Sequence, residues 1–297
     1  MSDENQSVRI SDRLFALLQL VLPQHLLSRA MHWLTRLESN WFRRPFTRWF
    51  VKHFAIDLGE AVEENLDNYP TFNAFFTRAL KPTAREFAAG SDVLACPVDG
   101  TVSQIGELRN GSVLQAKGHD YSVRELLGDR ADLAELFDGG LFATIYLAPY
   151  NYHRIHMPTD GVLTETIYVP GRLFSVNAAT ARAIPRLFAR NERVACMFDT
   201  AAGPMAMVLV GALFVGSIET VWAGEVTPPH RGATEHRTYI DDGPELTRGA
   251  EMGRFNMGST VILLLPKARA EWDPQLRSGE TVRLGMSIGR VTESGKS

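Results

Sequence analysis

The sequence is poor in cysteine, and it lacks both long apolar runs and a strong charge of either sign. Cys96 and Cys196 are the only two cysteines among 297 residues, and they lie far apart, so the chain has no disulfide framework and no cysteine pair with metal-ligand spacing. The net charge of -3 gives no reason to expect nucleic acid as a partner. No GxGxxG or P-loop motif indicates a nucleotide fold. The rest of the composition, 45% hydrophobic and 22% charged, is typical of a globular protein with a substantial core.

The first segment of the chain combines apolar, aromatic and basic residues. Residues 14–28 carry no charge, but they are too few and too interrupted for a transmembrane helix, and no small-x-small site suggests a signal peptide. In residues 29–54, phenylalanines recur at every fourth position and share a helix face, although Pro45 is expected to begin a new helix. Arginines beside such a face favour an interfacial helix, while packing on the protein's own core is the alternative. The expected membrane contacts are Trp33, Trp41, Phe42, Arg43, Arg44, Phe46, Trp49 and Phe50.

A polar stretch, residues 60–68, separates this segment from a second unit that is mostly β. We expect a helical segment over 1–68 and a β-rich domain over 69–297, which begins with a short helix capped by Thr71. Strands are expected over 100–105, 112–116, 141–147, 161–169, 193–199, 206–210, 212–222, 260–265 and 282–291. Helical patterns return over 122–127, 132–137 and 178–188. The fold class is therefore α+β, with a sandwich- or barrel-like β core, and the turns at 97–102 and 279–289 are similar to those of lipoyl-type barrel-sandwich domains.

The chemistry-bearing residues are a serine, two histidines and an aspartate. Ser259 follows Gly258 at the start of the apolar run 260–265, where it is either a nucleophile or a turn residue. His153 and His156 are three positions apart in extended chain, so they are expected to face opposite sides and not to share a metal. Asp99, in a Pro-Val-Asp-Gly turn, is a candidate to orient a histidine base, but spacing alone does not select it.

Six motifs, in the same order throughout, resemble the phosphatidylserine decarboxylase family. They are PVDG (97–100), QAKGHDYS (115–122), HRIHMP (153–158), YVPGRLFSVN (168–177), VGSIETVWAG (215–224) and MGST (257–260). The resemblance runs from about residue 14 to residue 291, and Met257 replaces the family's commoner leucine.

The resemblance implies a proenzyme that cuts itself between Gly258 and Ser259. Asp99 would orient His156, His156 would deprotonate Ser259, and the alkoxide would attack the Gly258 carbonyl. The products would be a large chain, 1–258, and a small chain, 259–297, whose first residue becomes a pyruvoyl group. That covalent pyruvate would be the only cofactor, and no metal would be needed.

The implied reaction is decarboxylation of phosphatidylserine to phosphatidylethanolamine through a Schiff base with the pyruvoyl group, with His153 acting in that step. The implied partners are phosphatidylserine and an anionic membrane surface. The resemblance implies a peripheral protein on the cytoplasmic side of the cell membrane, and a homodimer is possible. Two alternatives stay open at this point. One is a pyruvoyl-dependent decarboxylase of a soluble amino acid, and the other is a non-catalytic lipoyl-like binding module.

Overall fold

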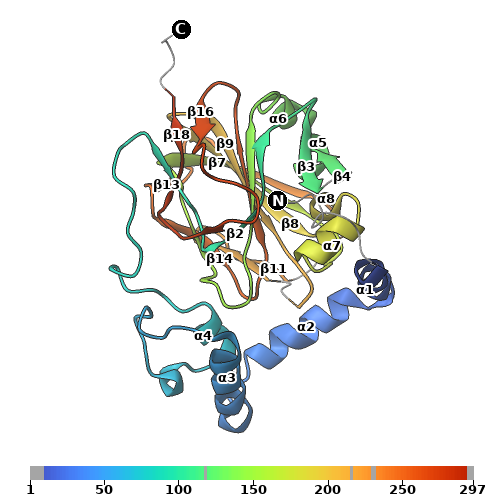
Figure 1. Ribbon diagram of the computed structural model, residues 1–297, viewed down its shortest axis with the longest axis vertical. Coiled ribbons are helices and arrows are strands. Elements are labelled where there is room, and N and C mark those ends of the chain that lie inside the picture. Colours follow the sequence, from blue (N-terminus) through green and yellow to red (C-terminus); the bar gives the residue numbers. More distant parts are fainter. Residues whose placement is uncertain (1–9, 117–118, 215–216, 229–231, 293–297) are drawn as a thin grey trace.

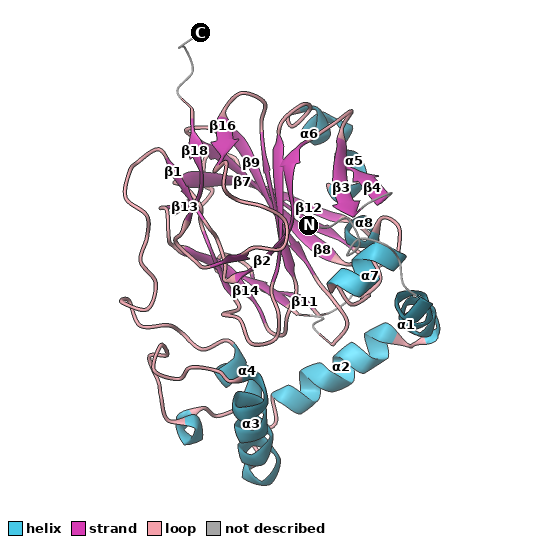
Figure 2. Cartoon of the chain, viewed as in Figure 1, coloured by secondary structure: helices cyan, strands magenta, loops and turns pink. Residues whose placement is uncertain are grey.

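The computed structural model describes residues 10–116, 119–214, 217–228 and 232–292. Antiparallel sheets form the body of the molecule, and the N-terminal helices lie along one end of it (Figures 1 and 2). Motif residues 117–118 and 215–216 lie outside the described parts of the chain. The strand expected over 212–222 is wrong in its bounds, because residues 212–214 and 221–222 form loop and turns and, of the described residues there, only β10 (Ile218–Thr220) is a strand.

A nine-stranded sheet organises the fold, and one strand near its middle continues the candidate cleavage site. Its path is β12 (Glu235–Thr238), β7 (Gly161–Val169), β8 (Arg193–Thr200), β9 (Gly203–Val210), β15 (Thr260–Leu265), β5 (Leu141–Tyr146), β2 (Gly100–Glu107) and β17 (Thr281–Val282), with β13 (Glu245–Leu246) paired to β7. All six residues of β15 are buried, and both of its edges are hydrogen-bonded, to β5 and to β9. A strand buried on both faces reads as a continuous apolar run, as its sequence does.

Side chains of β15 alternate between two hydrophobic cores, one on each face of the large sheet. Ile262 and Leu264 point into the core that contains Phe142 and Phe188, whereas Val261 and Leu263 point into the one that contains Met207. This two-sided burial makes the register of β15 strict, because a slip by one residue would exchange its two faces.

Three smaller sheets surround the large one. They are β11 (Gly224–Thr227), β10 (Ile218–Thr220), β14 (Glu251–Phe255) and β6 (Arg154–His156); β1 (Val93–Ala95), β18 (Ser287–Val291) and β16 (Ala270–Trp272); and β3 (Ser112–Ala116) with β4 (His119–Ser122). The two turns that resemble barrel-sandwich elements meet in the large sheet, since Thr281 and Val282 of β17 pair with Thr101 and Gly100 of β2. The prediction of a mixed fold with a mainly β core is confirmed, but the described sheets do not close into a barrel.

Helices occupy one end of the molecule, and shorter ones pack into the core on one face of the large sheet. They are α1 (Ile10–Val21), α2 (Gln24–Thr35), α3 (Asn40–Phe54), the short 3-10 helix Leu66–Asn68, α4 (Phe72–Phe76), α5 (Val123–Leu126), α6 (Ala131–Glu135), α7 (Ala178–Ala183) and α8 (Leu187–Arg190). Thr71 caps α4 as predicted, because its hydroxyl accepts a hydrogen bond of 3.0 Å from the Ala74 amide. No described helix could cross a membrane alone; α1 and α2 have the length and composition only as a pair, and they are bent by 83°.

Helix α3 corrects two expectations drawn from its sequence. Pro45 lies inside this single helix and does not begin a new one, because its missing amide removes only one bond and packing of the neighbouring phenylalanines holds the turn. Phe50 is only 5% exposed and packs against Phe72 at 5.0 Å between ring centroids, so its expected membrane contact is wrong. The aromatic cluster of α3 and α4 therefore spans the boundary expected at 68/69.

The Phe50 side chain should stabilise the docking of α3, unlike its neighbour Trp49, which is 53% exposed. Phe50→Ala should lower the free energy of unfolding by about 3–5 kcal/mol, since it leaves a cavity among the α4 rings. Trp49→Ala is the matched control and should cost much less. Urea unfolding of both variants measures this, and equal losses would contradict the assignment of Phe50 to the core.

Candidate active site

The candidate cleavage site lies in the link between two sheets. Strand β14 belongs to the four-stranded sheet and β15 to the nine-stranded one, so residues 256–259 cross from one to the other. The Ser259 carbonyl accepts a hydrogen bond of 2.8 Å from the Leu147 amide, and the His153 carbonyl accepts one of 3.0 Å from the Phe255 amide. These bonds hold the residue before β6 beside the link.

Gly258 lies directly against the ring of His153. A Cβ atom at position 258 would lie 3.3 Å from His153 Nε2 and 3.2 Å from the Leu147 carbonyl oxygen. The main chain at the candidate scissile bond is therefore within contact distance of a ring nitrogen. A side chain there would crowd both neighbours.

Two polar atoms at this point are buried and have no hydrogen-bond partner. Ser259 and His153 are both 0% exposed, and neither Ser259 Oγ nor His153 Nε2 has a partner among the described residues. An unpaired buried polar atom costs about 1–3 kcal/mol. Thr260 Oγ1, on the next residue, is a third such atom, and native proteins rarely keep buried polar atoms unpaired without a structural or chemical reason.

His153 is neutral, and its free nitrogen is the unprotonated one. Its Nδ1 lies 2.8 Å from the Asn151 carbonyl oxygen, which can only accept, so Nδ1 carries the proton and Nε2 is left as a base. Burial lowers the pKa of His153 from 6.5 to about 3, and the nearby charge of Arg78 adds to this lowering. The ring packs against Phe76 in a tilted arrangement, with 4.2 Å between centroids.

His156 has different partners, as the alternation of an extended chain predicts. Its Nδ1 donates to the Gly249 carbonyl at 2.7 Å, and its Nε2 accepts from the Tyr152 hydroxyl at 3.1 Å. Burial is the main cause that lowers the pKa of His156. Both histidines are therefore neutral bases near pH 7, each held in one tautomer by a backbone carbonyl.

Asp99 does not orient His156 through a hydrogen bond, so that expectation is wrong for this structure. The buried Asp99 carboxylate accepts from Arg85 Nε at 3.0 Å and from the Leu284 amide at 2.8 Å. The arginine fork satisfies both carboxylate oxygens and leaves no free lone pair aimed at an imidazole. The charge of Asp99 still acts at longer range, where it opposes the larger effect of burial on the pKa of His156.

A cavity of about 190 Å³ lies against the link. Its lining is mostly apolar and consists of Phe76, Tyr146, Leu147, Pro149, Ser175, Val176, Ala212, Leu213, Phe214, Met257 and Gly258. A second cavity, of about 310 Å³, shares Tyr146 and Val176 with it and adds polar side chains such as Thr101, Ser103 and Arg182. Together they offer an apolar space at the candidate scissile bond and, next to it, a space that polar side chains line in part.

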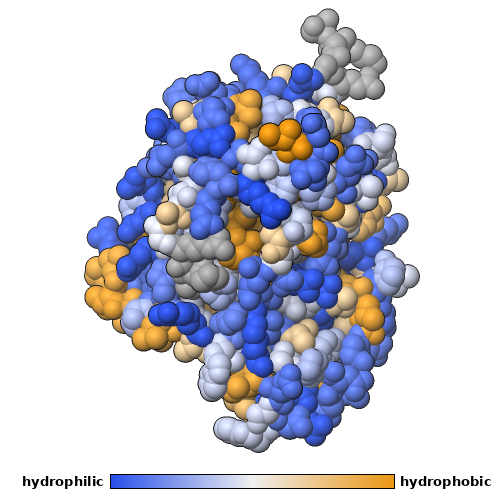
Figure 3. Space-filling view, turned by 180° about the vertical axis from the view of Figure 1, so that it is seen from behind, coloured by the Kyte–Doolittle hydropathy of each residue, from blue (hydrophilic) through white to orange (hydrophobic). Residues whose placement is uncertain are grey.

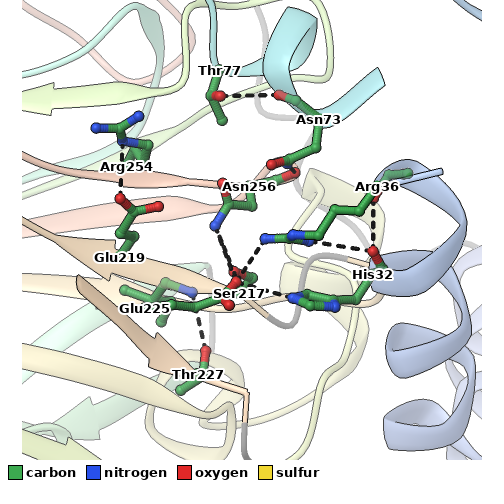
Figure 4. A network of polar contacts seen from close by, with 12 residues as sticks. His32, Arg36, Asn73, Thr77, Ser217, Glu219, Glu225, Thr227, Arg254 and Asn256 are labelled. Carbon is green, nitrogen blue, oxygen red and sulfur yellow. Dashed lines mark hydrogen bonds and ion pairs between the residues drawn. The ribbon is translucent and has the colours of Figure 1, made fainter. Parts of the chain in front are cut away.

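A polar network holds the link from the side of α2 (Figure 4). Asn256 is 3% exposed; its side-chain amide donates to Ser217 Oγ at 2.6 Å, and its carbonyl accepts from the Asn73 amide at 2.8 Å. The Ser217 hydroxyl in turn contacts the Glu225 carboxylate, which also binds Arg36 Nη2 at 2.7 Å and His32 Nε2 at 3.0 Å. Figure 4 shows His32 and Arg36 reaching this carboxylate from α2.

The sequence prediction missed several of these residues. Arg85, Tyr152, Glu225 and Asn256 lie in or near the quoted motifs, but nothing in their spacing indicated which partners they would meet. The described residues contain no group of three or more metal-ligating side chains.

The residues expected to touch a membrane divide into three groups, exposed, buried and half-buried. Trp33, Trp41 and Trp49 are 65%, 83% and 53% exposed, and Arg44 is exposed too. Arg43 is 6% exposed and its guanidinium donates to the backbone carbonyls of residues 67 and 69, so the expectation of a lipid contact is wrong for it, as it is for Phe50. Phe42 and Phe46 are half-buried beside Phe50.

Comparison with known proteins identifies relatives along almost the whole chain. A family model described as phosphatidylserine decarboxylase matches residues 72–290, and a second model, described as PSD, matches residues 14–55. The phosphatidylserine decarboxylase proenzyme of Ectopseudomonas mendocina (strain ymp) is 51% identical over 284 residues, which cover 95% of this chain and 99% of that protein.

Two further proenzymes of the same name come from other bacteria. That of Methylococcus capsulatus (strain ATCC 33009 / NCIMB 11132 / Bath) is 49% identical over 93% of this chain and 96% of its own length. That of Alkalilimnicola ehrlichii (strain ATCC BAA-1101 / DSM 17681 / MLHE-1) is 55% identical over 85% of this chain and 88% of its own length.

The lowered pKa of His153 should make the folded chain sensitive to acid. Below about pH 6.5 the unfolded state binds a proton at this histidine, whereas the folded state does not until about pH 3. The contribution of His153 to the free energy of unfolding is therefore fully present above about pH 6.5. It is lost as the pH falls, by up to about 1.4 kcal/mol per pH unit. His153→Gln should flatten this dependence.

Urea unfolding between about pH 7 and pH 4 measures that slope. Both proteins should carry Ser259→Ala, so that each is a single chain. Parallel pH dependences with and without His153 would show that the ring is not held neutral by burial.

Proposed function

The chain belongs to the phosphatidylserine decarboxylase family, and from this premise we propose that it cuts itself between Gly258 and Ser259 and then converts phosphatidylserine to phosphatidylethanolamine and carbon dioxide. The observation that carries the proposal is the pair of buried, unpartnered atoms at the link, Ser259 Oγ and His153 Nε2. A buried serine hydroxyl without a partner among the described residues, directly after a glycine that has no side chain of its own, suits an attack on its own peptide bond.

The cleavage uses only atoms of this chain and one water. Ser259 Oγ attacks the Gly258 carbonyl carbon, the C–N bond breaks, and the peptide becomes an ester. Removal of the Ser259 α-proton then expels the Gly258 carboxylate and leaves a carbon–carbon double bond at position 259. Addition of water and loss of ammonia convert that residue to a pyruvoyl group at the start of the chain 259–297.

We assign the deprotonation of Ser259 to His156, with Asp99 as the charge that favours its protonated form. Both nitrogens of His156 are engaged here, so Nε2 must release the Tyr152 hydroxyl before it can take a proton. Asp99 opposes the lowering of the His156 pKa by burial, which is what a general base needs as it becomes charged.

His153 fits a role at the group that replaces Ser259. The pyruvoyl group supplies a carbonyl that condenses with the serine amine and takes up the electrons released as carbon dioxide leaves. The site fits this group in two respects. Ser259 is fully enclosed, and its hydroxyl oxygen has no partner among the described residues; a neutral nitrogen base, His153 Nε2, lies beside Gly258. We assign to His153 the proton transfer at this point, since its Nε2 has no hydrogen-bond partner in the described part of the chain.

The first two helices support a role at the membrane surface, because their apolar side faces outward. The buried side chains of these helices are mainly polar, namely Asp12, Gln19, Gln24, Ser28 and Thr35. Apart from Ser11, Arg13 and Arg29, their exposed side chains are apolar, among them Leu14 62%, Leu17 58%, Leu18 54%, Val21 79%, Leu26 58% and Trp33 65%. In Figure 3, seen from behind, apolar side chains gather at the lower left, the edge where α1 lies.

An outward apolar face of this size favours shallow insertion into a lipid surface. The exposed Trp41 and Trp49 of α3, with Arg44 and Arg48, supply aromatic and cationic groups at the same end of the molecule. We propose a peripheral protein on the cytoplasmic side of the cell membrane. The two buried free thiols agree with this location, because the cytoplasm is a reducing compartment. A decarboxylase of a soluble amino acid would have no use for this face.

Cleavage is tested by the size of the purified chains. The wild-type protein should give two pieces on a denaturing gel, whereas Ser259→Ala should stay whole at 33.0 kDa and should not decarboxylate phosphatidylserine, because it cannot form the ester or the carbonyl. His156→Ala should also stay whole. His153→Ala should split but lose at least about a hundredfold in turnover.

Two outcomes would overturn these assignments. A Ser259→Ala chain that still splits would move the cleavage elsewhere. A His156→Ala chain that splits at the wild-type rate would remove that histidine from the first reaction.

The membrane face is tested by replacing Leu17, Leu18 and Trp33 together with serine. Burial of such side chains in lipid contributes about 1.5–3 kcal/mol each, so vesicle binding should fall by more than about a hundredfold. Ile240→Ser is the control, since Ile240 is 76% exposed but far away in sequence. Sedimentation with phosphatidylserine-containing vesicles measures both, and undiminished binding of the triple variant would contradict the assignment.

A further inference from the structure

The polar inner side of α1 and α2 holds the two loops that form the wall of the catalytic cavity. The Gln19 side-chain oxygen accepts a hydrogen bond of 2.7 Å from the Ser175 amide, and the Gln24 side-chain oxygen accepts one of 2.9 Å from the Leu173 amide. The Ser28 hydroxyl accepts one of 3.2 Å from the Phe214 amide. Each bond joins a helix side chain to the main chain of a loop.

Two of the bonded residues line the 190 Å³ cavity. Ser175 belongs to the loop before α7, and Phe214 belongs to the loop after β9. Gln19 and Gln24 are 1% and 3% exposed. The Gln24 side-chain amide also joins α2 to α1, because its Nε2 donates to the Gln19 carbonyl at 2.8 Å, and Gln19 Nε2 donates to Thr180 Oγ1 of α7 at 3.2 Å. The loops thus receive their hydrogen-bond acceptors from the helices that carry the outward apolar face.

The far end of α2 reaches the link itself. Arg36 and His32 bind Glu225, Glu225 contacts Ser217, and Ser217 accepts from Asn256, two residues before Gly258 (Figure 4). Asn256 and Ser217 are 3% and 1% exposed, so this part of the chain of contacts is enclosed. Main-chain bonds reinforce it, since the Asn256 amide donates to the Ser217 carbonyl at 3.1 Å.

We propose that Gln19, Gln24 and Arg36 are positioning residues for the reactions at Ser259. Through the loops at Ser175 and Phe214 they set the shape of the cavity, and through Glu225 and Asn256 they set the approach of the link to β15. The two N-terminal helices are thus part of the catalytic unit, and lipid binding on their outer side acts on the same elements that shape the site. This inference rests on the proposed function.

The first test separates a change in the cavity from a loss of lipid binding. Gln19→Leu removes the acceptor for Ser175 while keeping most of the side-chain volume; Gln19→Glu keeps an acceptor oxygen there. With a short-chain phosphatidylserine below its micelle concentration, Gln19→Leu should raise KM about tenfold or more, since small misplacements are costly. Gln19→Glu should restore most of this, and vesicle binding should stay within about twofold for both, as both leave the outer face unchanged.

The second test addresses the link. Arg36→Met should slow self-cleavage about tenfold or more by releasing Glu225 from α2. Arg29→Met, the same change at an exposed position of the same helix, should cleave as the wild type does. Arg36 is partly exposed, so this variant should fold even if Gln19→Leu does not.

The outcomes distinguish this inference from the proposed function. A wild-type chain that never splits would overturn the proposed function itself. A wild-type chain that splits, together with an Arg36→Met chain that cleaves at the same rate, would overturn the positioning role of α2. A folded Gln19→Leu protein with wild-type KM and kcat would overturn that of α1.

Discussion

The pairing of β15 on both edges is the constraint on which the site depends. Each of its residues has a partner in β5, and five of the six also have one in β9. The Ser259 carbonyl extends the ladder to Leu147, so the serine is fixed by main-chain bonds and not by its side chain. Its hydroxyl is therefore left for chemistry. After a cut at 258/259, the same bonds would keep the new terminus in place.

Burial sets the chemical state of the side chains at the site. The same closed environment leaves Ser259 Oγ without a partner and keeps the two histidines neutral, because burial opposes their charged forms. Backbone carbonyls then fix which nitrogen of each ring carries the proton. A site of this kind is costly to the fold, and the extensively paired sheet around it offsets that cost.

Local pattern predicted the long strands of the large sheet closely, because β-branched and apolar runs bounded by turns have few other structures open to them. It was wrong over 212–222 and 282–291, where the described residues form only β10 and the separate strands β17 and β18, and it missed short strands such as β6 and β14. The boundaries of β3, β7 and β15 agree with those expected, and His153 and His156 have separate partners. The partner of Asp99 could not be predicted, since Arg85 competes with His156 for the carboxylate and only the folded chain decides between them. Periodicity likewise predicted that the phenylalanines of α3 share one helix face, but it could not show which face of a helix points to the core. In the structure α3 turns its phenylalanines inward, whereas α1 and α2 turn glutamines inward and leucines outward.

The most direct test of the account is the intact mass of the small chain from the purified wild-type protein. The account predicts a fragment that begins at position 259 and is lighter, by the mass of one ammonia molecule, than the same fragment with an N-terminal serine. A protein that decarboxylates phosphatidylserine while its small chain begins with an unmodified Ser259, or while it remains one uncut chain, would contradict it.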